Sequence, residues 1–177
     1  MKTLEDEQYV VIKVYKFAVF EIWRDFNVLS YIACPRYPYI RVYRLYDIEL
    51  DGNCFFRSIC YILTGSEEHM AIHTAIVNHM FHLADDDHNF TEHPSVEQYI
   101  VDTGMCEDGT WATTNEMVAV AHLLRTCLFS YNMEDASWHR FTPQNVEVNY
   151  DDDVPRMCMY IRHPSDHFDV VLSVLQN

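Results

Sequence analysis

Two short segments near opposite ends of the chain carry residues suited to nucleophilic catalysis. Asp51-Gly52-Asn53-Cys54 places a cysteine directly after a tight turn and directly before a helical pattern. His167-Phe168-Asp169 places a histidine and an acid two residues apart, at the start of an apolar run. A thiol that attacks a carbonyl needs a base to take its proton and an acid to orient that base. Together the two segments form the hypothesis of a thiol hydrolase.

The elements expected around these residues agree with that chemistry. At a helix N-terminus, free amides and the helix dipole favour a thiolate at Cys54 and can bind the oxyanion of a tetrahedral intermediate. On an extended strand, His167 and Asp169 project from the same face while Phe168 and Val170 point into the core. The alternative is structural, because a cysteine that opens a helix is more often a small buried apolar side chain than a nucleophile.

Composition limits the class of protein. With 177 residues, 49% of them hydrophobic, the chain is long enough for one domain with its own core. Its formal charge of −15 disfavours nucleic acid and anionic membranes as partners. Six cysteines without a CxxC pair indicate a reducing compartment, which we expect to be the cytoplasm, with access to the nucleus possible. The chain starts with acidic residues, and charges interrupt the apolar stretch that follows. This pattern argues against an export signal and against a membrane span.

The first forty residues are expected to form a separate extension. The apolar spacing over 9–32 predicts a helix, although the β-branched run 10–12 favours a strand. The prolines in 34–38 then break regular structure. We therefore predict an aromatic N-terminal extension, 1–40, that packs on a catalytic domain, 41–177.

The rest of the chain reads as helices first and strands last. Helices are predicted at 54–63, from a capping Ser66 to about 84, at 96–103 and at 114–125. Thr113 and Glu116 have capping-box spacing before the last of these helices. Extended segments are predicted at 42–50, 127–131, 138–141, 157–162 and 168–175. This order indicates an α+β fold of mixed α/β layers, with helices around a small central β-sheet.

Four segments in sequence order form one pattern: Asp51-Gly52-Asn53-Cys54-Phe55-Phe56-Arg57, Gly109-Thr110-Trp111-Ala112 with Glu116, Ser130-Tyr131-Asn132, and His167-Phe168-Asp169-Val170-Val171. This pattern resembles the motifs of the ovarian-tumour (OTU) family of deubiquitinating cysteine proteases. The resemblance spans about residues 45–175, and Phe55 and Ala112 are mild departures from the family pattern.

The resemblance implies roles for individual residues. Cys54 would be the nucleophile, His167 the base and Asp169 the acid of a triad. Asp51, Gly52 and Asn53 would shape the loop that forms the oxyanion hole, where the Cys54 amide donates to the oxyanion. Trp111 and Asp166 are candidate substrate contacts, and neither a metal nor a cofactor is expected.

The implied reaction is hydrolysis of isopeptide bonds at the C-terminus of ubiquitin through an acyl-enzyme thioester. The expected partner is ubiquitin or polyubiquitin, and acidic side chains at 85–87, 107–108, and 151–153 are candidates for attracting its arginine-bearing tail. Two alternatives remain: a catalytically inactive ubiquitin-binding or adaptor domain of the same fold, and a protease for another ubiquitin-like modifier.

Other residues are expected to be structural. His69, His73, His79 and His82 lie at helical spacings but lack a cysteine or carboxylate that would complete a zinc site. Trp111 and Trp138 are read first as buried core anchors, because large aromatic side chains dominate burial.

Overall fold

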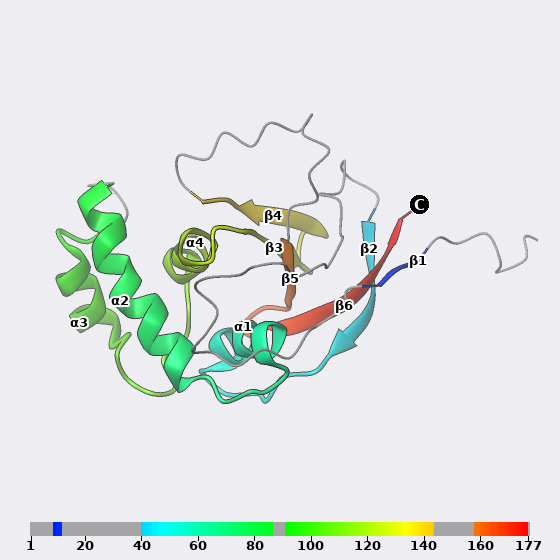
Figure 1. Cartoon of the computed structure of the whole chain (residues 1–177), viewed down its shortest axis with the longest axis horizontal. Helices are drawn as coiled ribbons and strands as arrows, with labels where there is room; N and C mark the ends of the chain where they lie inside the picture. Colours follow the sequence, from blue (N-terminus) through cyan, green and yellow to red (C-terminus); the bar gives the residue numbers. More distant parts are fainter. Residues whose placement is uncertain (1–8, 12–39, 87–90, 144–157, 177) are drawn as a thin grey trace, which may run out of the picture.

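A six-stranded mixed sheet forms the centre of the described part of the molecule (Figure 1). The computed structural model describes residues 9–11, 40–86, 91–143 and 158–176. The strands are β1 (Tyr9–Val11), β2 (Ile40–Tyr46), β3 (Cys127–Asn132), β4 (Ser137–Phe141), β5 (Cys158–His163) and β6 (Asp169–Gln176). The pairing of β3 with β5 is parallel, whereas β4 with β3, β5 with β6, and β1 and β2 with β6 are antiparallel.

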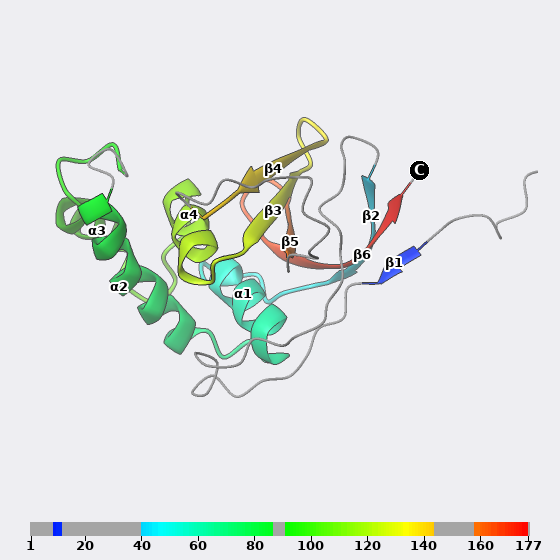
Figure 2. The ribbon, with the colours of Figure 1, turned by 45° about the horizontal axis from the view of Figure 1, so that its top comes forward.

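The helices precede β3 in the chain, as the sequence predicted. They are α1 (Cys54–Thr64), α2 (Met70–Asp86), α3 (Val96–Thr103) and α4 (Thr114–Leu123). Both ribbon views place α1 against the sheet beside β6, and α2 and α3 farther out, on the other side of α4 from the sheet (Figures 1 and 2). None of the described helices is long and apolar enough to cross a membrane.

Alternation along the strands divides the buried side chains between the two faces of the sheet. Leu128 and Ile161 belong to the core that includes helix residues such as Phe55, Ile59 and Met80. Their neighbours in the strands, such as Phe129 and Tyr160, form a second cluster. Successive strand side chains point to opposite faces, so β3 and β5 are buried on both sides. This double burial makes them a rigid base for the residues at their ends.

The helix boundaries follow local signals in the sequence. Gly65, at φ 74°, closes α1 in the left-handed region that favours glycine. Thr113 and Glu116 form the predicted capping box at the start of α4. The fold is the predicted α+β arrangement.

Two local predictions are wrong. Residues 9–11 form a strand paired with β6, not the start of a helix, because β-branched side chains favour an extended backbone that the edge of β6 can bind. Ser66 does not cap α2, which begins only at Met70; its hydroxyl accepts from the Glu68 amide in a local turn. The remainder of the predicted 9–32 helix lies outside the described residues, so the packing of the extension stays a prediction.

Candidate active site

Cys54 is the first residue of α1 and is buried, with 3% of its surface exposed. Burial raises the pKa of its thiol, while hydrogen bonds from the amides of Phe168, Phe55 and Cys54 itself lower it. The Asp51 carboxylate has a further raising effect, and the pKa stays above the ordinary value for cysteine. Contrary to the expectation, the helix N-terminus does not by itself produce a lowered pKa, because desolvation of the buried thiolate outweighs the amides.

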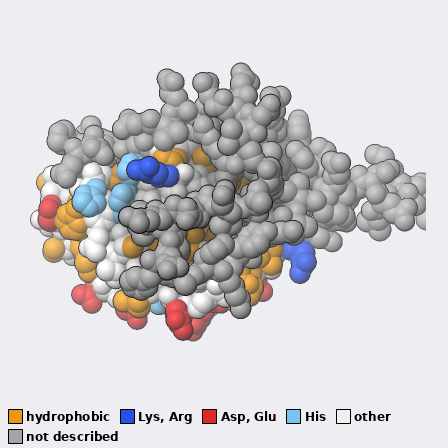
Figure 3. Space-filling model, viewed as in Figure 1, with side chains coloured by type: hydrophobic (Ala, Val, Ile, Leu, Met, Phe, Trp, Pro, Cys, Tyr) orange, Lys and Arg blue, Asp and Glu red, His pale blue; other side chains and the backbone are white. Residues whose placement is uncertain are grey.

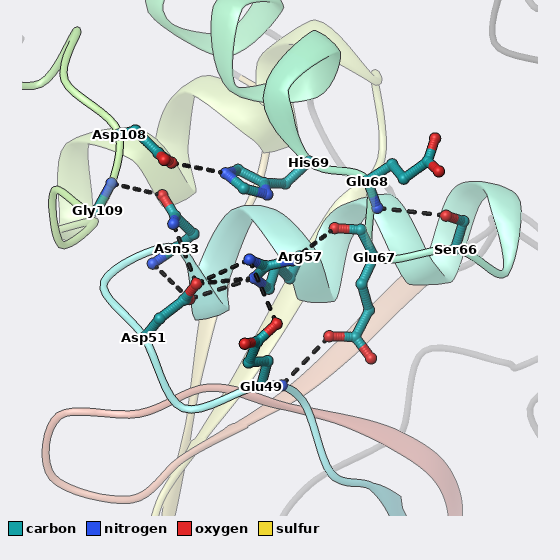
Figure 4. Close-up of polar contacts among 10 residues, drawn as sticks. All are labelled: Glu49, Asp51, Asn53, Arg57, Ser66, Glu67, Glu68, His69, Asp108 and Gly109. Carbon is teal, nitrogen blue, oxygen red and sulfur yellow. Dashed lines mark hydrogen bonds and ion pairs between the residues drawn. The ribbon is translucent and has the colours of Figure 1, made fainter.

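The turn before α1 is organised around the Asp51 carboxylate (Figure 4). It accepts hydrogen bonds from the Asn53 amide at 2.9 Å and the Asn53 side-chain nitrogen at 3.1 Å. Arg57, one turn into the helix, donates to it from Nε at 3.0 Å and from Nη2 at 2.8 Å. Burial alone would raise the pKa of Asp51, but the bonds from Arg57 and Asn53 together hold it below its usual value. The carboxylate is therefore a fixed anionic centre for the loop.

A second loop packs directly against this turn. The side-chain oxygen of Asn53 accepts from the Gly109 amide at 2.8 Å (Figure 4). A Cβ on Gly52 would lie 1.7 Å from the Gly109 carbonyl oxygen, so only glycine fits there. This contact explains why Asn53, although it is the N-cap residue, makes no side-chain capping bond. The predicted loop residues Asp51, Gly52 and Asn53 thus hold one another and the Gly109 segment.

The Cys54 amide is already hydrogen-bonded in this arrangement. It donates to the Asp51 carbonyl at 3.2 Å, a long bond. Use of this amide as an oxyanion donor, as the resemblance implied, requires that bond to be exchanged.

The predicted base and acid are in direct contact. His167 Nε2 donates to Asp169 Oδ1 at 3.0 Å, and both residues are buried. His167 Nδ1 is buried and has no hydrogen-bond partner among the residues described. The strand begins only at Asp169, so His167 stands in the preceding loop, where its amide donates to the Pro164 carbonyl at 3.0 Å. Phe168 is in the core as predicted.

Phe168 brings the two halves of the site together. Its carbonyl accepts from Ser58 Oγ, one turn along α1, at 3.2 Å, and its backbone amide is close enough to the Cys54 thiol to lower the pKa of that thiol. Its ring packs edge-on against Phe55, with centroids 5.3 Å apart. The residue directly after His167 therefore contacts the first two turns of α1 through its carbonyl and its ring, which brings the loop of the predicted base beside the helix that begins with Cys54.

Two groups that bind Asp169 were not predicted from the sequence. The Ile48 amide donates to Oδ1 at 3.3 Å. Arg162 donates to Oδ2 from Nε at 3.0 Å and also from Nη2. Arg162 could be predicted as a partner of Asp169 only by someone who knew how β5 and β6 pair. In that pairing Arg162 and Asp169 are directly opposite each other.

The candidate substrate contacts are both exposed. Trp111 lies two residues after Gly109 and is 48% exposed. The prediction that it is a buried core residue is therefore wrong. Asp166 is exposed beside His167. Trp138 is partly buried and packs on the second apolar cluster.

The acidic groups and histidines have mixed positions. The acidic side chains of Glu107 and Asp108 are exposed. The acidic groups at 151–153 and part of 85–87 lie outside the described residues. On the face in Figure 3, acidic side chains lie along the lower margin, the side of α1 and the start of α2.

Two of the histidines contact the loop before α4. Asp108 accepts from His69 Nε2 at 3.2 Å, and His73 Nε2 donates to the Met105 carbonyl at 2.7 Å. These two histidines therefore hold the loop that carries Gly109.

Comparison with known proteins agrees with this geometry. The sequence profile described as OTU-like cysteine protease matches residues 49–168, from the turn before Cys54 to the loop of His167. An Arabidopsis thaliana protein named ovarian tumor domain-containing deubiquitinating enzyme 7 is 28% identical over 131 residues, which cover 73% of this chain. The match spans 33% of that longer protein.

Solved structures show the same fold at low sequence identity. The OTU domain of OTUD1 superposes with a TM-score of 0.58 at 19% identity, covering 75% of this chain and 85% of that one. An ovarian tumor domain in complex with ubiquitin gives 0.57 at 11% identity, covering 75% and 73%. The Hazara virus OTU bound to ubiquitin gives 0.51 at 18% identity, covering 78% and 83%.

Proposed function

Because the chain belongs to the family of OTU-like cysteine proteases, we propose that it hydrolyses isopeptide bonds at the C-terminus of ubiquitin. The name of the Arabidopsis relative and the two ubiquitin complexes among the similar structures support ubiquitin as the partner. The observation that carries the proposal is the state of His167. One of its ring nitrogens is held by Asp169, while the other is buried without a partner among the described residues. An imidazole that is oriented by an acid and keeps one nitrogen available to accept a proton meets one requirement of a general base.

The reaction begins with transfer of the Cys54 thiol proton to Nδ1 of His167. The thiolate then attacks the carbonyl carbon of the last ubiquitin residue, and negative charge develops on the carbonyl oxygen at the N-terminus of α1. Collapse of the tetrahedral intermediate breaks the C–N bond; the lysine amine takes the proton from His167, and a thioester remains on Cys54. Water, deprotonated by His167, then hydrolyses the thioester and regenerates the thiol.

The raised pKa of Cys54 fits a thiol that gives its proton to His167 only once substrate is bound. A neutral thiol is the resting form when burial disfavours the thiolate. The same chemistry requires a reduced cysteine, so we place the protein in a reducing compartment such as the cytoplasm.

One observation favours a second candidate, an inactive ubiquitin-binding domain. Cys54 is only 3% exposed, so a substrate carbonyl must displace neighbouring atoms to reach the sulfur. In that case the fold would bind ubiquitin without cleaving it.

A panel of diubiquitins of every linkage type separates the two candidates. The wild type is expected to cleave at least one linkage and Cys54→Ala none. Cys106→Ala is the matched control, because Cys106 is an exposed free cysteine and its loss should leave cleavage unchanged. If the wild type binds but cleaves no linkage, or if Cys54→Ala still cleaves, the proposed enzyme function is wrong.

A further inference from the structure

Asp169 is a buried carboxylate whose two oxygens have different partners. Its side chain is 2% exposed. Oδ1 accepts from His167 Nε2 at 3.0 Å and from the Ile48 amide at 3.3 Å. Oδ2 accepts only from Arg162 in the described part of the chain, through both Nε and Nη2. The histidine and the arginine are thus bound by opposite oxygens of one group.

The sheet register produces this division. Arg162 on β5 and Asp169 on β6 are directly opposite in an antiparallel pair, and such residues project from the same face. The connection between them, 163–168, returns the chain so that His167 reaches the same carboxylate from the other side. His163 stacks on Phe168 with ring centroids 4.1 Å apart, which packs this connection.

Charge explains why Arg162 matters to a carboxylate at this depth. Removing a carboxylate from water is strongly unfavourable unless a partner compensates its charge. Neutral imidazole and one backbone amide do not neutralise the charge at Oδ1, whereas the guanidinium at Oδ2 does. Arg162 also retains contact with water, since its side chain is 25% exposed, so its own desolvation is smaller.

Geometry gives the second reason. A carboxylate can rotate about the bond that joins it to Cβ, and such a rotation would remove Oδ1 from His167. Two donors from one planar guanidinium resist that rotation, because they hold Oδ2 in a fixed direction. With Oδ1 fixed, the His167 proton stays on Nε2 and Nδ1 remains an acceptor for the thiol proton.

We propose that Arg162 is a positioning residue of this site, which acts on the reaction only through Asp169 by holding its carboxylate aimed at His167. This inference rests on the proposed hydrolase function. It adds a fourth member to the predicted Cys54, His167 and Asp169 set.

A double-mutant cycle tests the proposal on a cleaved ubiquitin substrate. Arg162→Gln should lower kcat/KM by about tenfold to a hundredfold, mainly in kcat, because misplacing a catalytic group has costs of that order. In an Asp169→Asn background the same change should cost less than about threefold, since the group through which Arg162 acts is already altered. Arg162→Lys keeps the charge but loses the fork, so its loss should be intermediate. Arg125→Gln, which removes an exposed arginine, is the matched control and should leave kcat/KM unchanged.

Three results would overturn the proposal. They are an Arg162→Gln variant with kcat/KM within about twofold of wild type, an equal loss in both backgrounds, and a loss confined to KM. Arg162→Lys supplies the same comparison if Arg162→Gln does not fold. If the wild type itself cleaves nothing, the proposed function fails rather than this inference.

A readout without activity keeps the inference testable in that case. In Cys54→Ala protein, the ¹⁵N signals of His167 should show the proton on Nε2. Adding Arg162→Gln or Arg162→Lys should give a mixture of tautomers. An unchanged tautomer in both would contradict the positioning role.

Discussion

Gly52 is the residue at which the structure leaves no room for any side chain. A methyl group there would meet the carbonyl of Gly109, which belongs to the backbone and cannot turn away as a side chain can. We predict that Gly52→Ala separates the two loops, lowers the free energy of unfolding by roughly 1–3 kcal/mol and abolishes most catalysis. Urea unfolding and kcat/KM measure the two effects.

Gly109→Ala is the matched control for this prediction. A Cβ at Gly109 meets nothing within 4 Å, so the cost there is only the strain of φ +86° in a non-glycine residue. We expect Gly52→Ala to lose more activity than Gly109→Ala. Equal losses would mean that the close approach of the two loops is unimportant.

The Asp51 carboxylate makes the stability of the folded protein depend on pH. Its pKa is held below the ordinary 3.8 because the bonds from Arg57 and Asn53 exceed the effect of burial. A carboxyl with a depressed pKa stabilises the folded state fully above its unfolded pKa, and this contribution is lost as pH falls through the folded pKa. The stability advantage of wild type over Asp51→Asn should therefore be constant at about pH 6 to about pH 5 and shrink below about pH 4. Chemical unfolding at a series of pH values measures it, and an advantage that grows on acidification would contradict this account.

Single residues also show what the sequence can predict. The position of Cys54 at a helix start and the nearness of His167 to Asp169 were predicted from residue type and spacing, because each residue stands beside a turn or strand signal. Arg162 and the Gly109 contact were not found, since both depend on which strands and loops become neighbours. The pKa of Cys54 was expected to be lowered but is raised, because burial of the thiol cannot be read from its position at a helix start.

At the scale of elements, α4 depends on one buried carboxylate. Glu116 is fully buried and accepts from the Thr113 amide at 2.7 Å and from the Tyr99 hydroxyl at 2.9 Å. Burial raises the pKa of Glu116, and burial together with the nearby Glu116 carboxylate raises the pKa of Tyr99 well above its usual value, so the tyrosine stays a donor. Glu116 therefore links α3, through Tyr99, to the start of α4, through Thr113.

We predict that Glu116→Ala lowers the free energy of unfolding by roughly 2–4 kcal/mol, since it removes half of a capping box and leaves the Tyr99 hydroxyl and the Thr113 amide without this partner. Glu97→Ala, at an exposed position in the first turn of α3, should cost less than about 0.5 kcal/mol. Thermal or urea unfolding compares the two. Similar losses would show that the buried network contributes nothing beyond a surface acid.

Most elements were predictable because their signals are local. The capping box and helical periodicity located α4, and turn residues separated the four strands at the end of the chain. The strand at Tyr9–Val11 was missed because its pairing with β6 joins segments more than 160 residues apart. Long-range pairing also decides that β6 contacts β1, β2 and β5, which no single segment reveals.

At the scale of the whole molecule, the net charge of −15 predicts attraction of a cationic substrate tail. For cleavage of a ubiquitin substrate, kcat/KM should fall several-fold as ionic strength rises from about 0.05 M to about 0.5 M. Asp166→Lys, beside His167, should lower kcat/KM and flatten its salt dependence. Glu97→Lys changes the net charge equally on α3 and should do neither. A salt dependence that is the same in both variants would mean that Asp166 does not attract the tail.

If Cys54 is a nucleophile that ubiquitin reaches, a reactive ubiquitin will trap it covalently. Ubiquitin that carries a thiol-reactive group at its C-terminus should form one adduct with the wild type, with Cys54 as the modified residue in mass spectrometry. Cys54→Ala should form none, and Cys106→Ala should react like the wild type. Absence of an adduct with the wild type, or an undiminished adduct with Cys54→Ala, would contradict the account.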